Sequence, residues 1–233
     1  MKQIKGKPLR AVVALLQLIF VSIPAIAQDK TEVSIGADVV SGYIWRGTEL
    51  GGVSVQPGIT LSRSGFSLTA WSSVGLERID TKEFDLTLGY SIGKFSAAVT
   101  DYWFNTSNSY FDYAAHTTAH IYEATLGYDF GIFSLSWNTN LGGFDYAKKG
   151  DKRAYSTYAE VAVPFTLGGY DFAAEVGLTP WEGAYSNKLN VTNIGLKAAK
   201  NIVVTESFSI PTFAKVVINP YEEQAYFVFG LSF

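Results

Sequence analysis

The sequence predicts an all-β protein, a closed antiparallel up-and-down transmembrane β-barrel of about twelve strands. Three observations predict this fold. Apolar and polar residues alternate with period two from residue 31 to the end, the connections between alternating segments are short and long in turn, and aromatic residues reach 15% while charged residues stay at 17%. Shifted boundaries would allow about ten or about fourteen strands instead.

The first 27 residues are predicted to be a secretory signal peptide that is removed, which leaves residues 28–233 as one barrel domain. Four basic residues precede an apolar run at 11–23, and Ala25-Ile-Ala27 has the pattern of a cleavage site. The apolar run is shorter than the roughly 20 residues of a membrane-spanning helix. Without the four leader bases, the mature chain has a net charge of 14 − 21 = −7, which argues against a nucleic-acid partner.

Each alternating segment is taken as one strand. The segments lie at 31–46, 52–63, 66–77, 83–92, 95–105, 118–130, 132–142, 153–167, 170–180, 189–199, 204–218 and 224–233. Every second connection is a short turn, the last of them near Lys200-Asn201, whereas the other connections are mostly longer and polar. Short turns on one rim and long loops on the other are typical of outer-membrane barrels.

The apolar strand face is predicted to point outward, toward outer-membrane lipid and lipopolysaccharide. Aromatic residues border the short turns, and glycine recurs on the polar face, where it leaves room inside a small barrel. The last strand ends on Phe233, a terminal pattern that resembles the signal read by the barrel-assembly machinery. We therefore expect a Gram-negative outer-membrane location with both termini in the periplasm.

The segment Ser41-Gly-Tyr-Ile-Trp-Arg-Gly47 resembles the SDYVFRG-type motif of the TorF-like porin family, a group of conserved outer-membrane proteins. Four further segments keep that family's order: Gln56-Pro-Gly-Ile, Ser64-Gly-Phe66, Trp71-Ser-Ser73 and Glu83-Phe-Asp-Leu-Thr-Leu-Gly-Tyr90. The similarity covers about the first third of the mature chain, and Gly42 replaces the family's usual Asp. It implies an outer-membrane barrel with pore activity.

Strand parity places a set of charged residues inside the barrel, because a basic side chain facing lipid at the midplane costs about 2–4 kcal/mol. We expect these residues to line the lumen and to set its selectivity: Asp38, Arg46, Asp85, Glu123, Glu160, Glu175, Lys197 and Lys215. They could form a paired network that fills the lumen, or a pore whose acidic excess disfavours anions. Arg46 is expected to end the first strand and to pair with a carboxylate, or else to constrict the outer mouth.

Other residue patterns are weaker. His116 and His120 are the histidines of the chain and could serve a lipid-modifying enzyme, but nothing in their spacing fixes a catalytic or metal geometry. Rim aromatic residues are read as an interfacial girdle or as sugar-stacking groups: Trp45, Trp103, Trp181, Tyr146 and Tyr185. Acids outside the strand cores are read as solvated loop charge, with bridging cations as an alternative: Glu49, Glu77, Asp80, Glu83, Asp145 and Asp151. We expect no cofactor and no structural metal.

The predicted function is passive diffusion of small hydrophilic solutes through a porin-like channel, without enzymatic activity. The alternative is a plugged structural or surface-interaction barrel whose long loops contact an external partner. An outer-membrane lipid-modifying enzyme is the third hypothesis.

Overall fold

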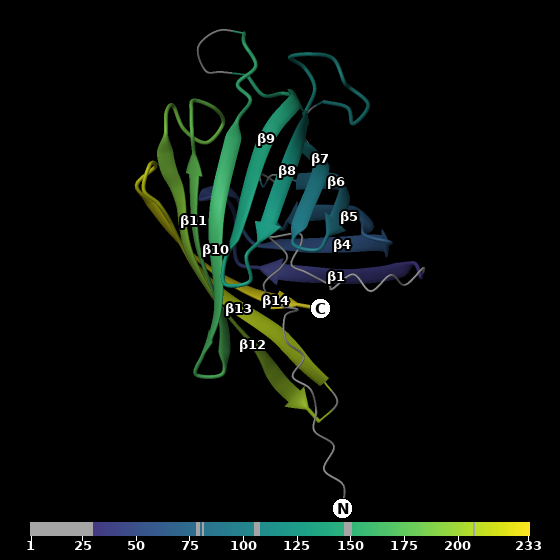
Figure 1. The fold of residues 1–233 in the computed structure, drawn as a ribbon, viewed down its shortest axis with the longest axis vertical. Helices are drawn as coiled ribbons and strands as arrows, with labels where there is room; N and C mark the ends of the chain where they lie inside the picture. Colours follow the sequence, from purple (N-terminus) through teal and green to yellow (C-terminus); the bar gives the residue numbers. More distant parts are fainter. Residues whose placement is uncertain (1–29, 78–79, 81, 105–107, 147–150, 207) are drawn as a thin grey trace, which may run out of the picture.

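A computed structural model describes residues 30–77, 80, 82–104, 108–146, 151–206 and 208–233. Twelve strands close into one antiparallel barrel, as predicted (Figure 1). The wall strands are β1 (Glu32–Val40), β4 (Ser54–Arg63), β5 (Phe66–Gly75), β6 (Lys82–Ile92), β7 (Phe95–Phe104), β8 (His120–Asp129), β9 (Ser134–Gly143), β10 (Thr157–Leu167), β11 (Tyr170–Thr179), β12 (Asn190–Thr205), β13 (Phe208–Asn219) and β14 (Gln224–Ser232). The predicted signal peptide lies outside the described residues and stays a prediction.

The barrel closes where the first wall strand meets the last. Each wall strand otherwise pairs with the wall strands next to it in the chain, and β1 pairs with both β4 and β14. The β1–β14 register covers three residue pairs, from Asp38 with Ser232 to Val40 with Gly230. Ala37 and Phe233 extend this seam by exchanging two backbone hydrogen bonds of 3.1 and 2.9 Å. The chain end is therefore part of the closure.

Two further strands do not belong to the wall. After Val40 the chain forms β2 (Tyr43–Trp45) and β3 (Thr48–Gly51), which pair with each other in a separate two-stranded sheet. The prediction of one continuous first strand over 31–46 is wrong beyond Val40, where β1 ends. Alternation cannot reveal this departure, because a second short strand continues the same period of two.

The short turns contain residues with positive φ, as tight hairpins require. Ser64 and Gly65 have φ of 51° and 84°, and Gly168 and Gly169 have φ of 59° and 78°. The predicted turn near Lys200-Asn201 is wrong, since β12 continues to Thr205. The β-branched run that follows position 201 favours extended backbone and carries the strand past that point.

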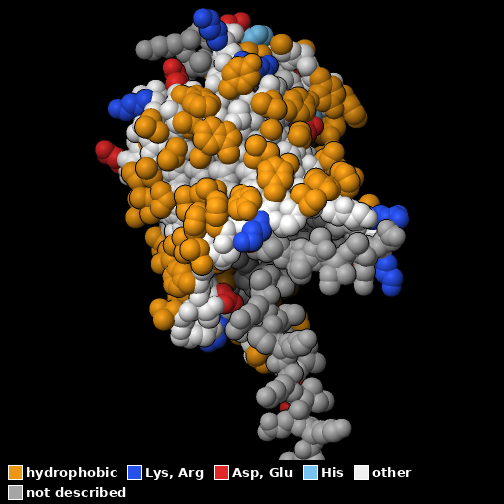
Figure 2. Space-filling view, in the orientation of Figure 1, with side chains coloured by type: hydrophobic (Ala, Val, Ile, Leu, Met, Phe, Trp, Pro, Cys, Tyr) orange, Lys and Arg blue, Asp and Glu red, His pale blue; other side chains and the backbone are white. Residues whose placement is uncertain are grey.

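The two faces of the wall have opposite chemistry. In β6, Leu86 and Leu88 are exposed, whereas Asp85 and Thr87 are buried. The same inversion holds around the barrel, so the buried residues that the structure describes are more often polar than apolar. Figure 2 shows apolar side chains over much of the outer wall on the side in view, with charged ones mainly toward the rims. Within the described residues, no helix has the length and hydrophobicity to cross a membrane.

A hairpin across the barrel lumen as candidate functional site

The β2–β3 hairpin presents Arg46 at its tip. Trp45 pairs with Thr48, so the turn has two central residues, Arg46 and Gly47, with φ of 51° and 84°. Positive φ at both positions is the mark of a type I′ turn, whose twist matches that of its flanking strands. The turn leaves the Arg46 side chain free to extend beyond the hairpin.

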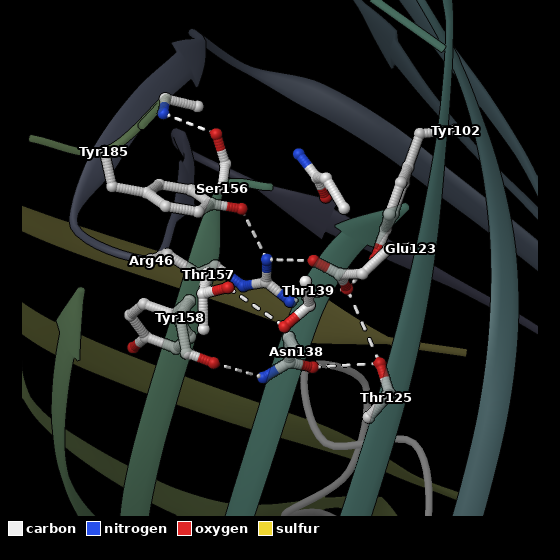
Figure 3. A network of polar contacts seen from close by, with 12 residues as sticks. Arg46, Tyr102, Glu123, Thr125, Asn138, Thr139, Ser156, Thr157, Tyr158 and Tyr185 are labelled. Carbon is white, nitrogen blue, oxygen red and sulfur yellow. Dashed lines mark hydrogen bonds and ion pairs between the residues drawn. The ribbon is translucent and has the colours of Figure 1, made fainter. Parts of the chain in front are cut away.

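Arg46 forms a bidentate ion pair with Glu123 of β8 (Figure 3). Its Nη1 lies 2.5 Å from Oε2 and its Nη2 lies 2.8 Å from Oε1 of the carboxylate. Tyr102 of β7 donates a third hydrogen bond to the same carboxylate at 2.9 Å. Both charged side chains are almost fully buried, with exposed fractions of 6% and 1%. Two parallel N–H···O bonds fix the geometry as well as the distance.

Aromatic rings surround the guanidinium of Arg46. Its Cζ lies 4.8 Å from the Trp45 ring centroid, 4.9 Å from that of Tyr158 and 5.5 Å from that of Tyr185. Arg46 Nη1 also donates a hydrogen bond to the Tyr185 hydroxyl, which comes from the loop between β11 and β12. Ring faces attract cations, and this attraction grows when water is excluded.

The charge states at the hairpin tip are well defined. Burial by itself lowers the pKa of Arg46, but the charge of Glu123 outweighs it and raises that pKa well above its usual range. Burial raises the pKa of Tyr185 to about 12, although the Arg46 charge opposes this shift. Arg46 is therefore a cation and Tyr185 a neutral phenol at neutral pH.

The backbone of the tip is seated against the opposite wall. Asn219 of β13 donates its Nδ2 hydrogen to the Gly47 carbonyl oxygen at 3.1 Å. A Cβ added at Gly47 would lie 1.8 Å from the carbonyl oxygen of Thr192 in β12. Only glycine fits, because the contact forbids a side chain and the positive φ disfavours one.

The two sides of β2 contact different parts of the wall. Ile44 joins a buried apolar cluster whose other members are Val40, Ala199, Phe213, Val217 and Val228. Tyr43 faces the other way, with its ring 5.7 Å from that of Trp71 in β5 and a side-chain hydrogen bond to Glu83 in β6. The hairpin thus contacts β5, β6, β8, β12 and β13, and it crosses the lumen.

A second polar cluster lies on the wall formed by β10 to β13. Lys215 Nζ is 2.6 Å from Glu175 Oε1. Asn193 donates to Glu175 at 2.8 Å, to Glu160 at 3.3 Å and to the Tyr158 hydroxyl at 3.1 Å. Because the Tyr158 ring also contacts Arg46 and its hydroxyl donates to Glu160, this residue joins the two clusters.

All eight predicted lumen residues are buried or half-buried. Seven come from wall strands. Arg46 comes from the hairpin, so the prediction that it ends the first strand is wrong, but the predicted pairing with a carboxylate is confirmed. Asp38 is buried with Lys197 as an electrostatic neighbour. Their role in selectivity stays a prediction.

Several residues of the site were missed or misread in the sequence. Glu83 and Asp145 were interpreted as solvated loop acids, but they are 3% and 4% exposed. Glu83 belongs to β6 and lies on the same inner face as Asp85. Because residues two apart share a strand face, the inward position predicted for Asp85 also indicates an inward Glu83. Tyr185 was read as a rim aromatic, yet it lies against Arg46 (Figure 3). No local signal marks Tyr185, because its loop has no regular period.

The two histidines lie in structural contacts. His120 is fully buried, with Nδ1 2.7 Å from an Asp101 carboxylate oxygen and Nε2 2.6 Å from the Tyr110 carbonyl oxygen. Neither ring nitrogen is free to accept a substrate proton. His116 lies 3.0 Å from Asp151 and stacks on Tyr146. In the part of the chain that the structure describes, no three His, Asp or Glu side chains are grouped to hold a metal ion.

Comparison with protein families adds one match. A family model described as a bacterial protein of unknown function (Gcw_chp) covers residues 25–219. The chain belongs to this family. The matched region of the Gcw_chp family includes the Ser41–Gly47 motif, the hairpin and all but the last wall strand. No curated protein matches the chain. Since the family description states no activity, the similarity to TorF-like porins stays a prediction.

Proposed function

We propose that this Gcw_chp protein is an outer-membrane β-barrel of the TorF-like porin type, through which small hydrophilic solutes diffuse passively. The observation that carries the proposal is the inverted wall, with apolar side chains outside and charged or polar ones inside. A soluble barrel would bury its leucine and phenylalanine side chains in the core. In lipid, a closed barrel also satisfies every strand N–H and C=O group.

The connections support an orientation. Long loops gather on one rim, near the β8 and β9 labels, while the short turns and the chain end lie toward the other (Figure 1). In outer-membrane barrels the short turns face the periplasm. We therefore propose that both termini are periplasmic, that the outer wall contacts lipid and lipopolysaccharide, and that Phe233 is recognised by the barrel-assembly machinery.

Charge on the inner face favours cations and neutral polar solutes over anions. Among the described inner-face residues, six acids face three bases: Asp38, Glu83, Asp85, Glu123, Glu160 and Glu175 against Arg46, Lys197 and Lys215. Acidic rings in a pore lower the energy of a cation relative to an anion. The hairpin occupies part of the same lumen, so we expect a narrow path and a small conductance.

The test is current through planar bilayers that contain the refolded chain from residue 28. We expect a small ohmic conductance with a reversal potential that favours cations in a salt gradient. Replacement of residues 43–51 by a short Gly–Ser linker should raise the conductance severalfold. Glu160→Gln should reduce the cation preference, while Glu206→Gln, a change at the exposed tip of the β12–β13 hairpin, should not.

A plugged barrel is the second candidate, because the buried Arg46–Glu123 pair holds the hairpin across the lumen. Folded wild-type protein that carries no current, together with current from the variant without residues 43–51, would support this candidate and contradict the open channel. The enzyme hypothesis has less support, since both ring nitrogens of His120 are already bonded. Unchanged lipopolysaccharide in cells that express the His116→Ala, His120→Ala variant would agree with a non-enzymatic barrel.

A further inference from the structure

Two carboxyl groups lie buried together beneath the hairpin. Glu83 and Asp85 are two residues apart on the inner face of β6 and are 3% and 7% exposed. Their carboxyl groups lie within hydrogen-bonding reach of each other, and the Tyr43 hydroxyl of the hairpin lies within reach of Glu83. One oxygen of each, Oε2 of Glu83 and Oδ1 of Asp85, has no hydrogen-bond partner.

A hydrogen bond between two carboxyl groups requires a proton, because ionised carboxylates only accept. Because two ionised carboxylates at these adjacent, buried positions would repel each other, the seated hairpin favours a pair that holds at least one proton. This shared proton is what keeps two negative charges from meeting in a site that excludes water.

The groups packed around the pair do not supply a neutralising charge. Asp101 and Tyr102 of β7, Glu123 of β8, and Tyr43 and Arg46 of the hairpin are its titratable or charged neighbours. Asp101 and Glu123 add negative potential. The one base of this set, Arg46, is held by Glu123 in a bidentate pair.

Tyr43 itself keeps its proton. Burial, followed by the negative charges of Glu83 and Asp85, raises the pKa of its hydroxyl well above the usual range. Tyr43 therefore stays neutral while the acid pair titrates, and its ring lies 5.7 Å from that of Trp71, the register partner of Asp85.

The hairpin is connected to the wall in a way that allows movement. Its two strands hydrogen-bond to each other in a sheet separate from the barrel. Its ends are tied by Ser41 to the Phe229 backbone and by Gly52 to Asp80, while side chains hold the remainder. Displacement of the hairpin would leave every wall strand paired.

We propose that the β2–β3 hairpin is a pH-dependent gate, seated while Glu83 and Asp85 share a proton and displaced when both are ionised. This inference rests on the proposed channel function. Removal of the shared proton leaves two like charges under Tyr43, and movement of the hairpin lets water reach them. Linkage of one proton to opening changes the ratio of open to closed channels by at most about tenfold per pH unit.

The test measures conductance from about pH 5 to about pH 9 for four refolded proteins. The wild type should open with rising pH toward the conductance of the variant without residues 43–51, which should itself be insensitive to pH. The Glu83→Gln, Asp85→Asn variant should stay at the low conductance throughout, because its amides donate hydrogen bonds without a titrating proton. The Glu206→Gln, Glu222→Gln variant is the matched control, since it also neutralises two acids, both of them exposed, and it should open like the wild type.

Each outcome separates the two proposals. If the hairpin-deleted variant carries current and the wild type carries a current that does not change with pH, the gate is overturned and the channel is left intact. An unchanged pH response in the Glu83→Gln, Asp85→Asn variant overturns the assignment to this pair. Absence of current from all four folded proteins overturns the channel itself. Should the double variant fail to fold, Asp85→Asn alone removes the shared proton and should also abolish the response.

Discussion

At the residue scale, the contact between Arg46 and Glu123 matters most, because each charge is buried and depends on the other. Removal of water from two ions is costly, and their attraction offsets this cost only when further hydrogen bonds complete the site. Here Tyr102 supplies one such bond to the carboxylate, and three aromatic rings surround the guanidinium. Loss of either partner would leave an uncompensated charge inside the barrel.

Glu123→Gln is therefore expected to lower the free energy of unfolding by about 3–5 kcal/mol. Urea titration of the refolded protein in lipid vesicles measures this change. Glu222→Gln, at an exposed position, is the control and should stay within about 0.5 kcal/mol of the wild type. The Arg46→Met, Glu123→Leu variant should recover most of the loss, since apolar groups can replace a buried ion pair. A double variant as unstable as Glu123→Gln would contradict this account.

Gly47 is a second position where one residue determines how closely the hairpin tip packs against the wall. Gly47→Ala should lower hydrogen-exchange protection of the Trp45 and Thr48 amides, because its Cβ would collide with the Thr192 carbonyl at a φ of 84°. Strain of this kind costs about 1–3 kcal/mol. Gly42→Ala is the matched control, since a Cβ there meets no atom within 4 Å. Equal loss of protection in both variants would show that the tip contact is unimportant.

At the scale of the element, a wall strand works by giving each face its own environment. On the inner face, Thr87 of β6 and Thr100 of β7 share a hydrogen bond, with their Oγ1 atoms 3.0 Å apart. On the outer face of β6, Leu86 and Leu88 are exposed. If the outer face meets lipid, the cost of a charge there must depend on its depth in the bilayer. Such a dependence distinguishes a membrane strand from a strand of a soluble barrel.

Leu88→Arg, near the middle of β6, should destabilise the barrel in lipid vesicles by about 2–4 kcal/mol. Ile92→Arg, at the turn end of the same strand, should cost only about 0–1 kcal/mol, because its charge can reach the interface. Both leucine and isoleucine are 58% exposed in the wild type, so burial in the protein cannot explain a difference between them. Equal costs would argue against a lipid-facing wall.

At the scale of the whole molecule, closure depends on a short seam at the chain end. Three register pairs and the two backbone bonds between Ala37 and Phe233 join β1 to β14. An unclosed edge exposes unpaired N–H and C=O groups, which lipid cannot satisfy. The backbone and the side chain of Phe233 therefore have separable roles: the first completes the seam, and the second is the proposed signal for assembly.

Deletion of Phe233 should slow folding into vesicles in vitro and lower the folded yield, because both backbone bonds to Ala37 are lost. Phe233→Ala keeps those bonds and should fold nearly as well as the wild type in vitro. In cells, however, Phe233→Ala should reduce the amount of barrel in the outer membrane. Gel mobility of unheated samples reports folding in both settings. Normal assembly of Phe233→Ala in cells would remove the proposed recognition of this side chain.

The wall could be predicted because its signals are local. Period-two alternation and short connections belong to single strands and turns, so they predicted the twelve strands of the wall. The hairpin could not be predicted in this way, since Tyr43-Ile-Trp45 has the same alternation as a wall strand. Glu83 is the first residue of the strand predicted at 83–92, and a terminal position gives no sign of whether an acid is buried; in the structure β6 begins at Lys82 and Glu83 shares the inner face with Asp85.

The sequence by itself determined that alternating apolar and polar residues would form strands, that short and long connections would arrange them as hairpins, and that each strand would have one apolar and one polar face. Only the tertiary structure decided where the segment after Val40 goes and which charges meet. Arg46 and Glu123 are 77 positions apart, and their pairing depends on the closure of the whole barrel. Periodicity describes neighbours along one strand, whereas contacts across a lumen depend on how all twelve strands place them.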